Sequence, residues 1–95
     1  MKKVYIYQII EPAEVDYAFR DYDEDKFQAE DYFYAGVVEV EEGNIDDMLE
    51  QAFSKGNTSS LANENPVARS VSTSDILEID KVKYYINAIG FKELK

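Results

Sequence analysis

The sequence predicts an α+β fold, with a small, mostly antiparallel sheet of about four to five strands and one main helix packed on one face. Two observations support this prediction. β-Branched and aromatic residues gather in short runs bounded by turn residues, and one segment places apolar residues at helical spacing. A chain of 95 residues is too short for two separate cores, so residues 1–95 are expected to form one domain.

The first predicted strand spans residues 3–10 and is apolar on both faces, which places it in the middle of the sheet. Pro12 ends it. Residues 13–31 are rich in Tyr, Asp and Glu, and we expect an extended segment at 17–20 followed by a helical turn or loop. The expected inward-facing anchors of this stretch are Ala18, Phe19, Tyr22 and Phe27.

The second strand is predicted over residues 32–40, and the charged turn that follows leads into the clearest element, a helix over residues 45–55. Asn44 is a good N-cap, and Lys55 followed by Gly56 is a typical C-terminal signal. The apolar stripe expected to face the sheet consists of Ile45, Met48, Leu49, Ala52 and Phe53.

Residues 56–68 are rich in Asn, Ser and Thr and are predicted to form a long surface loop. A short strand is expected at 76–79, and Asp80 and Lys81 are the predicted turn into a further strand at 82–87. Gly90 is expected to bend the chain before a last strand at 91–94. The C-terminal part of the chain therefore supplies three short strands.

The chain contains neither Cys nor His. The absence of Cys excludes disulfides and thiol chemistry and removes the commonest structural zinc ligand. The absence of His excludes an imidazole base and the nucleophilic arrangements that depend on one. Only carboxylate, Lys, Tyr or Ser chemistry remains, so the sequence favours a protein that is not an enzyme and uses no cofactor or metal.

The N-terminus begins with Lys2 and Lys3 and continues as an apolar run, as a signal peptide does. That run contains two Tyr and a Gln, ends at Glu11 and lacks a small-residue cleavage site, so we do not expect a signal peptide. No apolar stretch approaches the roughly 20 residues that span a bilayer. The sequence predicts a cytoplasmic protein without membrane contact.

The net charge of −10 is unevenly distributed along the chain. Residues 1–50 hold 15 acids against 4 bases, whereas residues 51–95 hold 5 acids against 6 bases. Direct binding to DNA or RNA is disfavoured, because neutralising phosphates requires clustered Lys and Arg. The charge pattern instead favours a basic partner. The oligomeric state cannot be inferred from the sequence.

Five segments resemble the YodL-like domains, in order and over nearly the whole chain. The most specific of them is Arg-Ser-x-Ser-x-Ser-Asp at 69–75, followed by Tyr-Tyr at 84–85 and Gly-Phe-Lys-Glu at 90–93. The others are Tyr-Ile-Tyr-Gln-Ile at 5–9, Ala-Phe-Arg-Asp-Tyr-Asp at 18–23 and Tyr-Ala-Gly at 34–36.

The resemblance implies a single YodL-like domain encoded by a bacterial mobile element or phage. Members of the family usually carry His-Pro and Gly before the Arg-Ser segment, where this chain has Asn65-Pro66 and Ala68. Any role of that imidazole is therefore absent here. The family brings no established catalytic residues, so the resemblance supplies a biological context and no active site.

Residues 69–75 allow two interpretations. Arg69 and the neighbouring hydroxyl groups have the chemistry of a site for a carboxylate or phosphate. Alternatively, the Ser and Asp side chains satisfy backbone groups of a turn while Arg69 pairs with an acid of the same chain. The second interpretation is favoured, because no base is present to activate the serines.

Asp21, Asp23 and Asp25 alternate as the first ligands of a calcium-binding loop do. The pattern then fails, because the sixth position is Lys26 rather than Gly and the twelfth is Tyr32 rather than a bidentate Glu. A solvated acidic turn is therefore favoured over a calcium site.

Acids alternate with Tyr between residues 11 and 34, which also allows two interpretations. Spaced carboxylates and Tyr rings can imitate nucleic acid and bind a basic groove. Alternatively, the acids only solubilise a segment whose tyrosines belong to the core. The candidate partner-binding residues are Asp16, Tyr17, Asp21, Tyr22, Asp23, Glu24, Asp25, Glu30, Asp31, Glu41, Glu42 and Arg69.

Charge and family context together predict a non-enzymatic DNA mimic that inhibits a host defence nuclease of the anti-CRISPR or antirestriction type. The expected partner is a basic nucleic-acid-binding protein, such as a CRISPR effector or a restriction enzyme. The acids of residues 11–31 and 39–50 would provide the contact, with the loop at 56–68 as a second one. An adaptor module of a mobile element is the alternative, and a small hydrolase is a weaker third.

Overall fold

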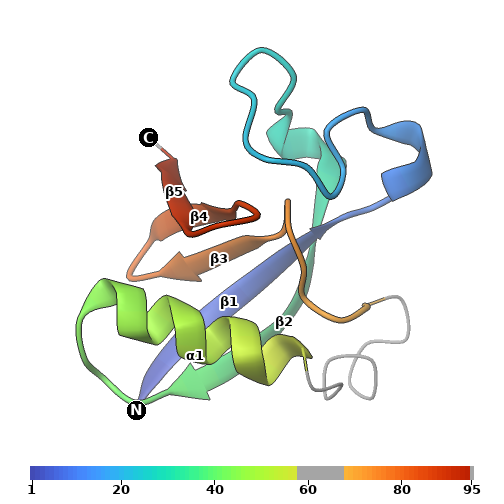
Figure 1. Cartoon of the computed structure of the whole chain (residues 1–95). Coiled ribbons are helices and arrows are strands. Elements are labelled where there is room, and N and C mark those ends of the chain that lie inside the picture. Colours follow the sequence, from blue (N-terminus) through green and yellow to red (C-terminus); the bar gives the residue numbers. More distant parts are fainter. Residues whose placement is uncertain (58–67, 95) are drawn as a thin grey trace.

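The computed structural model describes residues 1–57 and 68–94, which form a five-stranded antiparallel sheet and one α-helix (Figure 1). The predicted α+β class is confirmed. The strands are β1 (Lys2–Ile9), β2 (Tyr32–Val40), β3 (Ile76–Ile79), β4 (Val82–Ile86) and β5 (Phe91–Leu94). The helix is α1 (Ile45–Asn57), and two short 3₁₀ helices are η1 (Pro12–Glu14) and η2 (Ala29–Asp31).

The strand order in the sheet is β2-β1-β3-β4-β5, and each neighbouring pair is antiparallel. β1 therefore lies between two other strands, as its apolar residues on both faces predicted. Val4 and Ile6 are buried on the face that α1 covers, and Ile9 is buried on the opposite face. Ile10 lies just beyond the strand and is 56% exposed.

A bulge in β2 changes which face its side chains occupy. Ile6 pairs with Gly36 but Tyr7 pairs with Tyr34, so Ala35 is an extra residue in the ladder. Strict alternation would place Tyr34 on the same face as Val38, because the two are four residues apart. The bulge instead places Tyr34 beside Tyr7, on the face opposite α1.

The helix begins as predicted and ends two residues later than predicted. Asn44 caps it, since its Oδ1 accepts a hydrogen bond of 2.9 Å from the backbone N–H of Asp47. Gly56 is a buried residue of the last turn rather than the residue after the helix. A Cβ at Gly56 would lie 2.3 Å from Cγ2 of Val71, so this glycine permits close packing rather than a C-terminal turn.

The sheet has a hydrophobic core on each face. Between the sheet and α1, the buried helix residues Met48, Leu49 and Ala52 form one core cluster with buried side chains of β1, β2, β3 and β4. Phe53 packs against this cluster. Ile45 was predicted for this stripe but is 38% exposed. On the opposite face, Ile9 and strand residues of β3 and β4 pack under residues 11–31.

Residues 17–20 do not form the predicted extended segment. They belong to a series of turns in which Phe19 has a positive φ of 63° and a side chain that is 52% exposed. Tyr17 is the inward-facing anchor instead, with 3% of its surface exposed. In acid-rich turns, apolar and polar residues do not alternate regularly, so the sequence does not show which side chains face inward. The prediction therefore chose Phe19 instead of Tyr17.

The C-terminal strands follow the prediction closely. β3 and β5 have the predicted bounds, and β4 ends at Ile86, one residue before the predicted end. Asp80 and Lys81 connect β3 to β4 with φ values of 51° and 70°. The loop predicted at 56–68 lies mostly outside the described residues. No helix within the described residues has the length and apolar character needed to cross a membrane.

Candidate functional site

Residues 11–31, called the acidic segment below, form a lobe at the end of β1 and the start of β2 (Figure 1). The segment contains nine acids against two bases, Arg20 and Lys26. Its fold is a succession of η1, turns and η2, with no strand or long helix. The acids of this segment are thus gathered in one irregular lobe, as the nucleic-acid-mimicking interpretation requires.

An aromatic cluster fixes the acidic segment to the sheet. Tyr22 contacts Tyr85 of β4 edge-on with 5.3 Å between ring centroids, and Phe27 lies 5.6 Å from Tyr22 and 5.7 Å from Tyr32. Tyr17 lies 6.0 Å from Phe27. Such pairs add about 0.5–1.5 kcal/mol each to the burial of their rings. Tyr17 and Tyr22 therefore pack in the core. This agrees with the alternative interpretation, in which the acids only solubilise a segment whose tyrosines are part of the core.

Hydrogen bonds connect the same segment to the β4–β5 hairpin. The hydroxyl of Tyr85 donates to the carbonyl of Arg20 at 2.7 Å. The backbone N–H of Ala88 donates to Oδ1 of Asp21 at 2.7 Å, and the N–H of Tyr22 donates to Oδ1 of Asn87 at 2.8 Å. These bonds hold residues 20–22 in one position relative to the sheet, so the neighbouring carboxylates start from a fixed backbone.

The predicted partner-binding residues separate into three groups by exposure. Tyr17 is buried and offers no side-chain surface to a partner, and Tyr22, Asp23, Asp31 and Arg69 are partly buried. Asp31 accepts a hydrogen bond of 2.8 Å from the Tyr17 hydroxyl, and burial is the main cause that raises the pKa of Tyr17 to about 12. The exposed members are Asp16, Asp21, Glu24, Asp25, Glu30, Glu41 and Glu42.

The two acidic regions of the sequence lie at opposite ends of β2. The acidic segment ends where β2 begins, and Glu41 and Glu42 follow where it ends. Nine strand residues separate these ends by about 27 Å, at about 3.4 Å per residue. The carboxylates of 39–50 therefore do not extend the surface of the acidic segment into one continuous patch.

Within the part of the chain that the structure describes, no ion pair neutralises an acid of the acidic segment. The ion pairs within residues 1–57 and 68–94 are Lys2–Asp80, Arg69–Asp75 and Lys83–Glu78, and none includes an acid of 11–31. Asp23 has a structural role, since its Oδ1 accepts a hydrogen bond of 3.0 Å from the N–H of Asp25. The other two aspartates of this turn, Asp21 and Asp25, are exposed.

Two exposed apolar side chains accompany the acids. Ile89, in the β4–β5 hairpin, is 94% exposed, and Phe19 is 52% exposed. The hairpin of Ile89 is held by the hydrogen bond between Ala88 and Asp21. Apolar residues on a rigid, charged surface are typical anchors of protein–protein contacts.

Arg69, which is partly buried, forms a polar cluster with the buried residues Gln8 and Asp75, and these contacts agree with the structural interpretation of residues 69–75. Gln8 donates to the carbonyl of Arg69 at 2.7 Å and accepts from its N–H at 3.0 Å. Oδ2 of Asp75 accepts hydrogen bonds from the N–H of Ser72 and from Nε2 of Gln8. Nη2 of Arg69 lies 3.8 Å from Oδ1 of Asp75, and its guanidinium lies 5.9 Å from the ring of Phe19.

Asp75 carries a perturbed carboxyl group. Burial, which removes the charged form from water, raises its pKa to about 6, although the Ser72 N–H, Arg69 and Gln8 all act in the opposite direction. Desolvation prevails because the side chain is fully buried and the guanidinium is 3.8 Å away rather than at hydrogen-bond distance. Gln8 and Asp75 are fully buried, so we assign the cluster a structural role.

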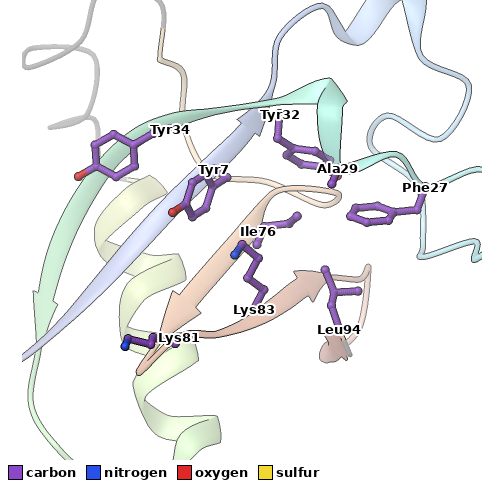
Figure 2. A pocket seen from close by; sticks show the side chains of 9 residues that line it. All are labelled: Tyr7, Phe27, Ala29, Tyr32, Tyr34, Ile76, Lys81, Lys83 and Leu94. Carbon is purple, nitrogen blue, oxygen red and sulfur yellow. The ribbon is translucent and has the colours of Figure 1, made fainter.

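A pocket of about 500 Å³ opens on the sheet face opposite α1, beside the acidic segment (Figure 2). Tyr7 and Tyr34 stand on one side of it, Phe27 and Tyr32 on the other, and Ile76 lies between them. Lys83 of β4 projects toward Tyr7, with Nζ 5.6 Å from the ring centroid. Sequence reasoning missed this pocket because the β2 bulge, which brings Tyr34 beside Tyr7, is not visible in the residue pattern.

Comparison with protein-family models, with curated proteins and with solved structures finds no match to this chain. The similarity to YodL-like domains therefore stays a prediction from the quoted segments. The fold and the two surfaces, the acidic segment and the pocket, are the basis for any functional conclusion.

Proposed function

We propose that the chain is a non-enzymatic protein that docks on a basic, nucleic-acid-binding protein and blocks it, as an anti-CRISPR or antirestriction inhibitor does. The observation that carries this proposal is the acidic segment, with nine acids against two bases on a backbone fixed by an aromatic cluster. Fixed carboxylates can replace phosphates in a groove lined by Lys and Arg, and they steer the two proteins together. The resemblance to YodL-like domains supports the mobile-element context.

The contact surface is smaller than the sequence suggested. We assign it to the exposed acids Asp16, Asp21, Glu24, Asp25 and Glu30, with Ile89 as an apolar anchor. Glu41 and Glu42 lie at the far end of β2, so only a large partner would reach both groups. A partner with a short basic groove, which accommodates one lobe of about 20 residues, matches this arrangement better than a partner with a long channel for duplex DNA.

An adaptor module of a mobile element is the second candidate. The exposed side chains of Ile89 and Phe19 favour it, because an apolar protrusion of this size serves a protein partner of any kind. An adaptor would bind a protein encoded beside it, and that complex would persist at high salt. Replacing Ile89 by Ser would weaken such a complex more than reversing the acids would.

The test is inhibition of DNA cleavage by a panel of purified CRISPR effectors and restriction enzymes. The variant Glu24→Lys/Asp25→Lys/Glu30→Lys reverses three exposed acids of the acidic segment. Its matched control, Glu39→Lys/Glu42→Lys/Glu50→Lys, makes the same change of net charge near the other end of β2 and on α1. We expect the first variant to raise the half-inhibitory concentration by about tenfold or more and the control to change it little.

Salt dependence provides a second measure. We expect inhibition to weaken as NaCl rises from about 50 to about 300 mM, because exposed charges are screened over that range. Inhibition that both triple variants reduce equally would show a nonspecific effect of net charge and contradict the proposal. Failure to inhibit any nuclease, together with salt-resistant binding to a neighbouring gene product, would favour the adaptor.

A further inference from the structure

We propose that the pocket on the open sheet face binds a nucleoside phosphate, independently of the acidic segment's partner. Its volume of about 500 Å³ lies within the range of about 300–1,000 Å³ typical of small-molecule sites. The aromatic side chains would contact the base, and the lysines at the pocket would contact the phosphate. Figure 2 shows Lys83 pointing toward the aromatic side chains, with Lys81 at the far edge of the pocket.

The aromatic walls are fixed before any ligand arrives. The rings of Tyr7 and Tyr34 pack edge-on with 5.8 Å between centroids, and Phe27 and Tyr32 lie 5.7 Å apart on the other side. The Tyr7 hydroxyl donates to Glu78 at 2.7 Å, and this bond is the main cause that raises the Tyr7 pKa to about 12. The ring is therefore neutral at physiological pH and held in place. Prearranged rings reduce the entropic cost of stacking a base.

The lysines give the pocket a local positive charge in a molecule whose net charge is −10. Lys83 and Lys81 both line it, and Lys83 is the more central, near the ring of Tyr7. Glu78 lies directly across the strand pair from Lys83, and their charged atoms are 3.8 Å apart. Glu78 offsets part of the charge of Lys83, but the pocket lining itself contains two lysines and no acid, so a cation is available to a phosphate.

The surrounding charge favours one small anion over a nucleic-acid strand. The acidic segment borders the pocket through Phe27 and Ala29 and carries seven more acids than bases. A strand leaving the pocket in that direction would have its phosphates repelled. A mononucleotide places its single phosphate at the lysines and presents only its base to the aromatic walls. The pocket thus selects for a ligand that ends within it.

The experiment is an isothermal titration of the full chain with adenosine 5′-monophosphate, alongside a ¹H–¹⁵N spectrum that locates the perturbed amides. Adenosine lacks the phosphate and ribose 5-phosphate lacks the base, so each isolates one half of the proposed contact. We expect the nucleotide to bind at least about tenfold more tightly than either fragment, with shifts at residues of β1, β2 and β4 around the pocket. Absence of binding at millimolar nucleotide would overturn the proposal.

Two variants with matched controls test the geometry. Tyr34→Ala removes an aromatic wall that is 47% exposed, and Tyr5→Ala removes an exposed tyrosine of the same face that does not line the pocket. Lys83→Gln removes the central cation, and Lys92→Gln makes the same change on β5 outside the lining. We expect the pocket variants to weaken binding by about fivefold or more and the controls by less than about twofold. Equal effects in a variant and its control would contradict the site.

Two further measurements distinguish mononucleotide binding from single-strand binding and from nuclease inhibition. If an eight-nucleotide single strand binds more tightly than the mononucleotide, the ligand is a nucleic-acid strand and the proposal is overturned. The Glu24→Lys/Asp25→Lys/Glu30→Lys variant should keep or increase its nucleotide affinity, because those acids lie outside the pocket lining and their charge repels a phosphate. Its failure in nuclease inhibition would therefore be independent of nucleotide binding.

Discussion

Three buried polar residues show how closely this small fold is specified. Asp75 and Gln8 place polar groups in the interior where most strand residues are apolar, and their hydrogen bonds join β1 to the chain that precedes β3. Ser74, next to Asp75, has a positive φ of 79° and a fully buried side chain. Its Oγ accepts from the Phe19 N–H and its carbonyl from the Tyr32 hydroxyl, so one strained residue connects three segments.

The raised pKa of Asp75 predicts a pH dependence of stability. Between pH 4 and 6 the folded state retains a proton that the unfolded state releases, so this group lowers the free energy of unfolding as pH rises through that window. Asp75→Asn cannot titrate. We expect the stability difference between wild type and this variant to change by up to about 3 kcal/mol between pH 4 and 7.

Urea unfolding at pH 4, 5, 6 and 7, followed by far-UV circular dichroism, measures this dependence. Glu93→Gln, which removes an exposed carboxylate on β5, serves as the control. A constant difference between wild type and Asp75→Asn across the whole range would contradict the assignment of the proton to Asp75.

Gly56→Ala is expected to destabilise the protein by about 1–3 kcal/mol, although alanine has the higher helix propensity. The added methyl group would overlap the stiff, β-branched side chain of Val71, which lies where the chain returns to the sheet. Ser54→Ala, at an exposed position of the same helix, is the matched control and should be neutral or slightly stabilising. The midpoint of urea unfolding distinguishes them, and equal midpoints would show that Val71 yields to the methyl group.

At the scale of elements, the hairpin formed by β3 and β4 has a two-residue turn whose second residue, Lys81, is unfavourable there. Asp80 and Lys81 both have positive φ, as a type I′ turn requires, and glycine is preferred at the second of these positions. The cross-strand pair of Ile79 and Val82 flanks the turn. Packing of the strands therefore imposes a backbone conformation that the lysine itself disfavours.

Lys81→Gly should stabilise the protein by about 0.5–1 kcal/mol, because it removes the steric cost of a left-handed conformation. Lys81→Ala removes the same charge but keeps the Cβ, so it should bring no gain. Thermal unfolding of the two variants in parallel distinguishes the effect of the backbone conformation on the melting temperature from the effect of the lost charge. A similar rise in the melting temperature of both would assign the effect to the lost lysine charge instead.

The elements with simple periodicity could be predicted from the sequence, and those that depend on remote contacts could not. β2, β3 and β5 have the predicted bounds because Gly43, Asp80 and Gly90 are local signals next to apolar runs. Local signals placed the end of α1 two residues early, because the packing of Gly56 on Val71 is a tertiary contact. The candidate site has the same limit. The sequence shows which residues are acids, but only the fold shows that they lie at two opposite ends of β2.

On the scale of the whole molecule, charge opposes compactness. Nine of the twenty acids lie in the acidic segment, which is held on the sheet by aromatic contacts and hydrogen bonds, with no ion pair to it among the described residues. Its carboxylates therefore repel one another in the native state more than in an expanded chain. The aromatic cluster must exceed this repulsion for the segment to stay docked.

Added salt should accordingly stabilise the protein. We expect the urea midpoint at pH 7 to rise as NaCl increases from about 20 to about 300 mM, because screening weakens the repulsion between exposed carboxylates. The gain should shrink in Glu24→Lys/Asp25→Lys/Glu30→Lys, which already removes much of that repulsion. A midpoint that is independent of salt in the wild type would show that the acids are too widely spaced to interact.

The central position of β1 also governs the order in which the chain can be completed during synthesis. Ile6 of β1 pairs with Leu77 of β3, 71 positions later, so a growing polypeptide has finished β2 and α1 long before the middle seam of the sheet can close. Until β3 emerges from the ribosome, β1 exposes a row of unpaired peptide groups to other nascent chains. Translation that stalls before β3 would therefore release a half-sheet that is prone to aggregation.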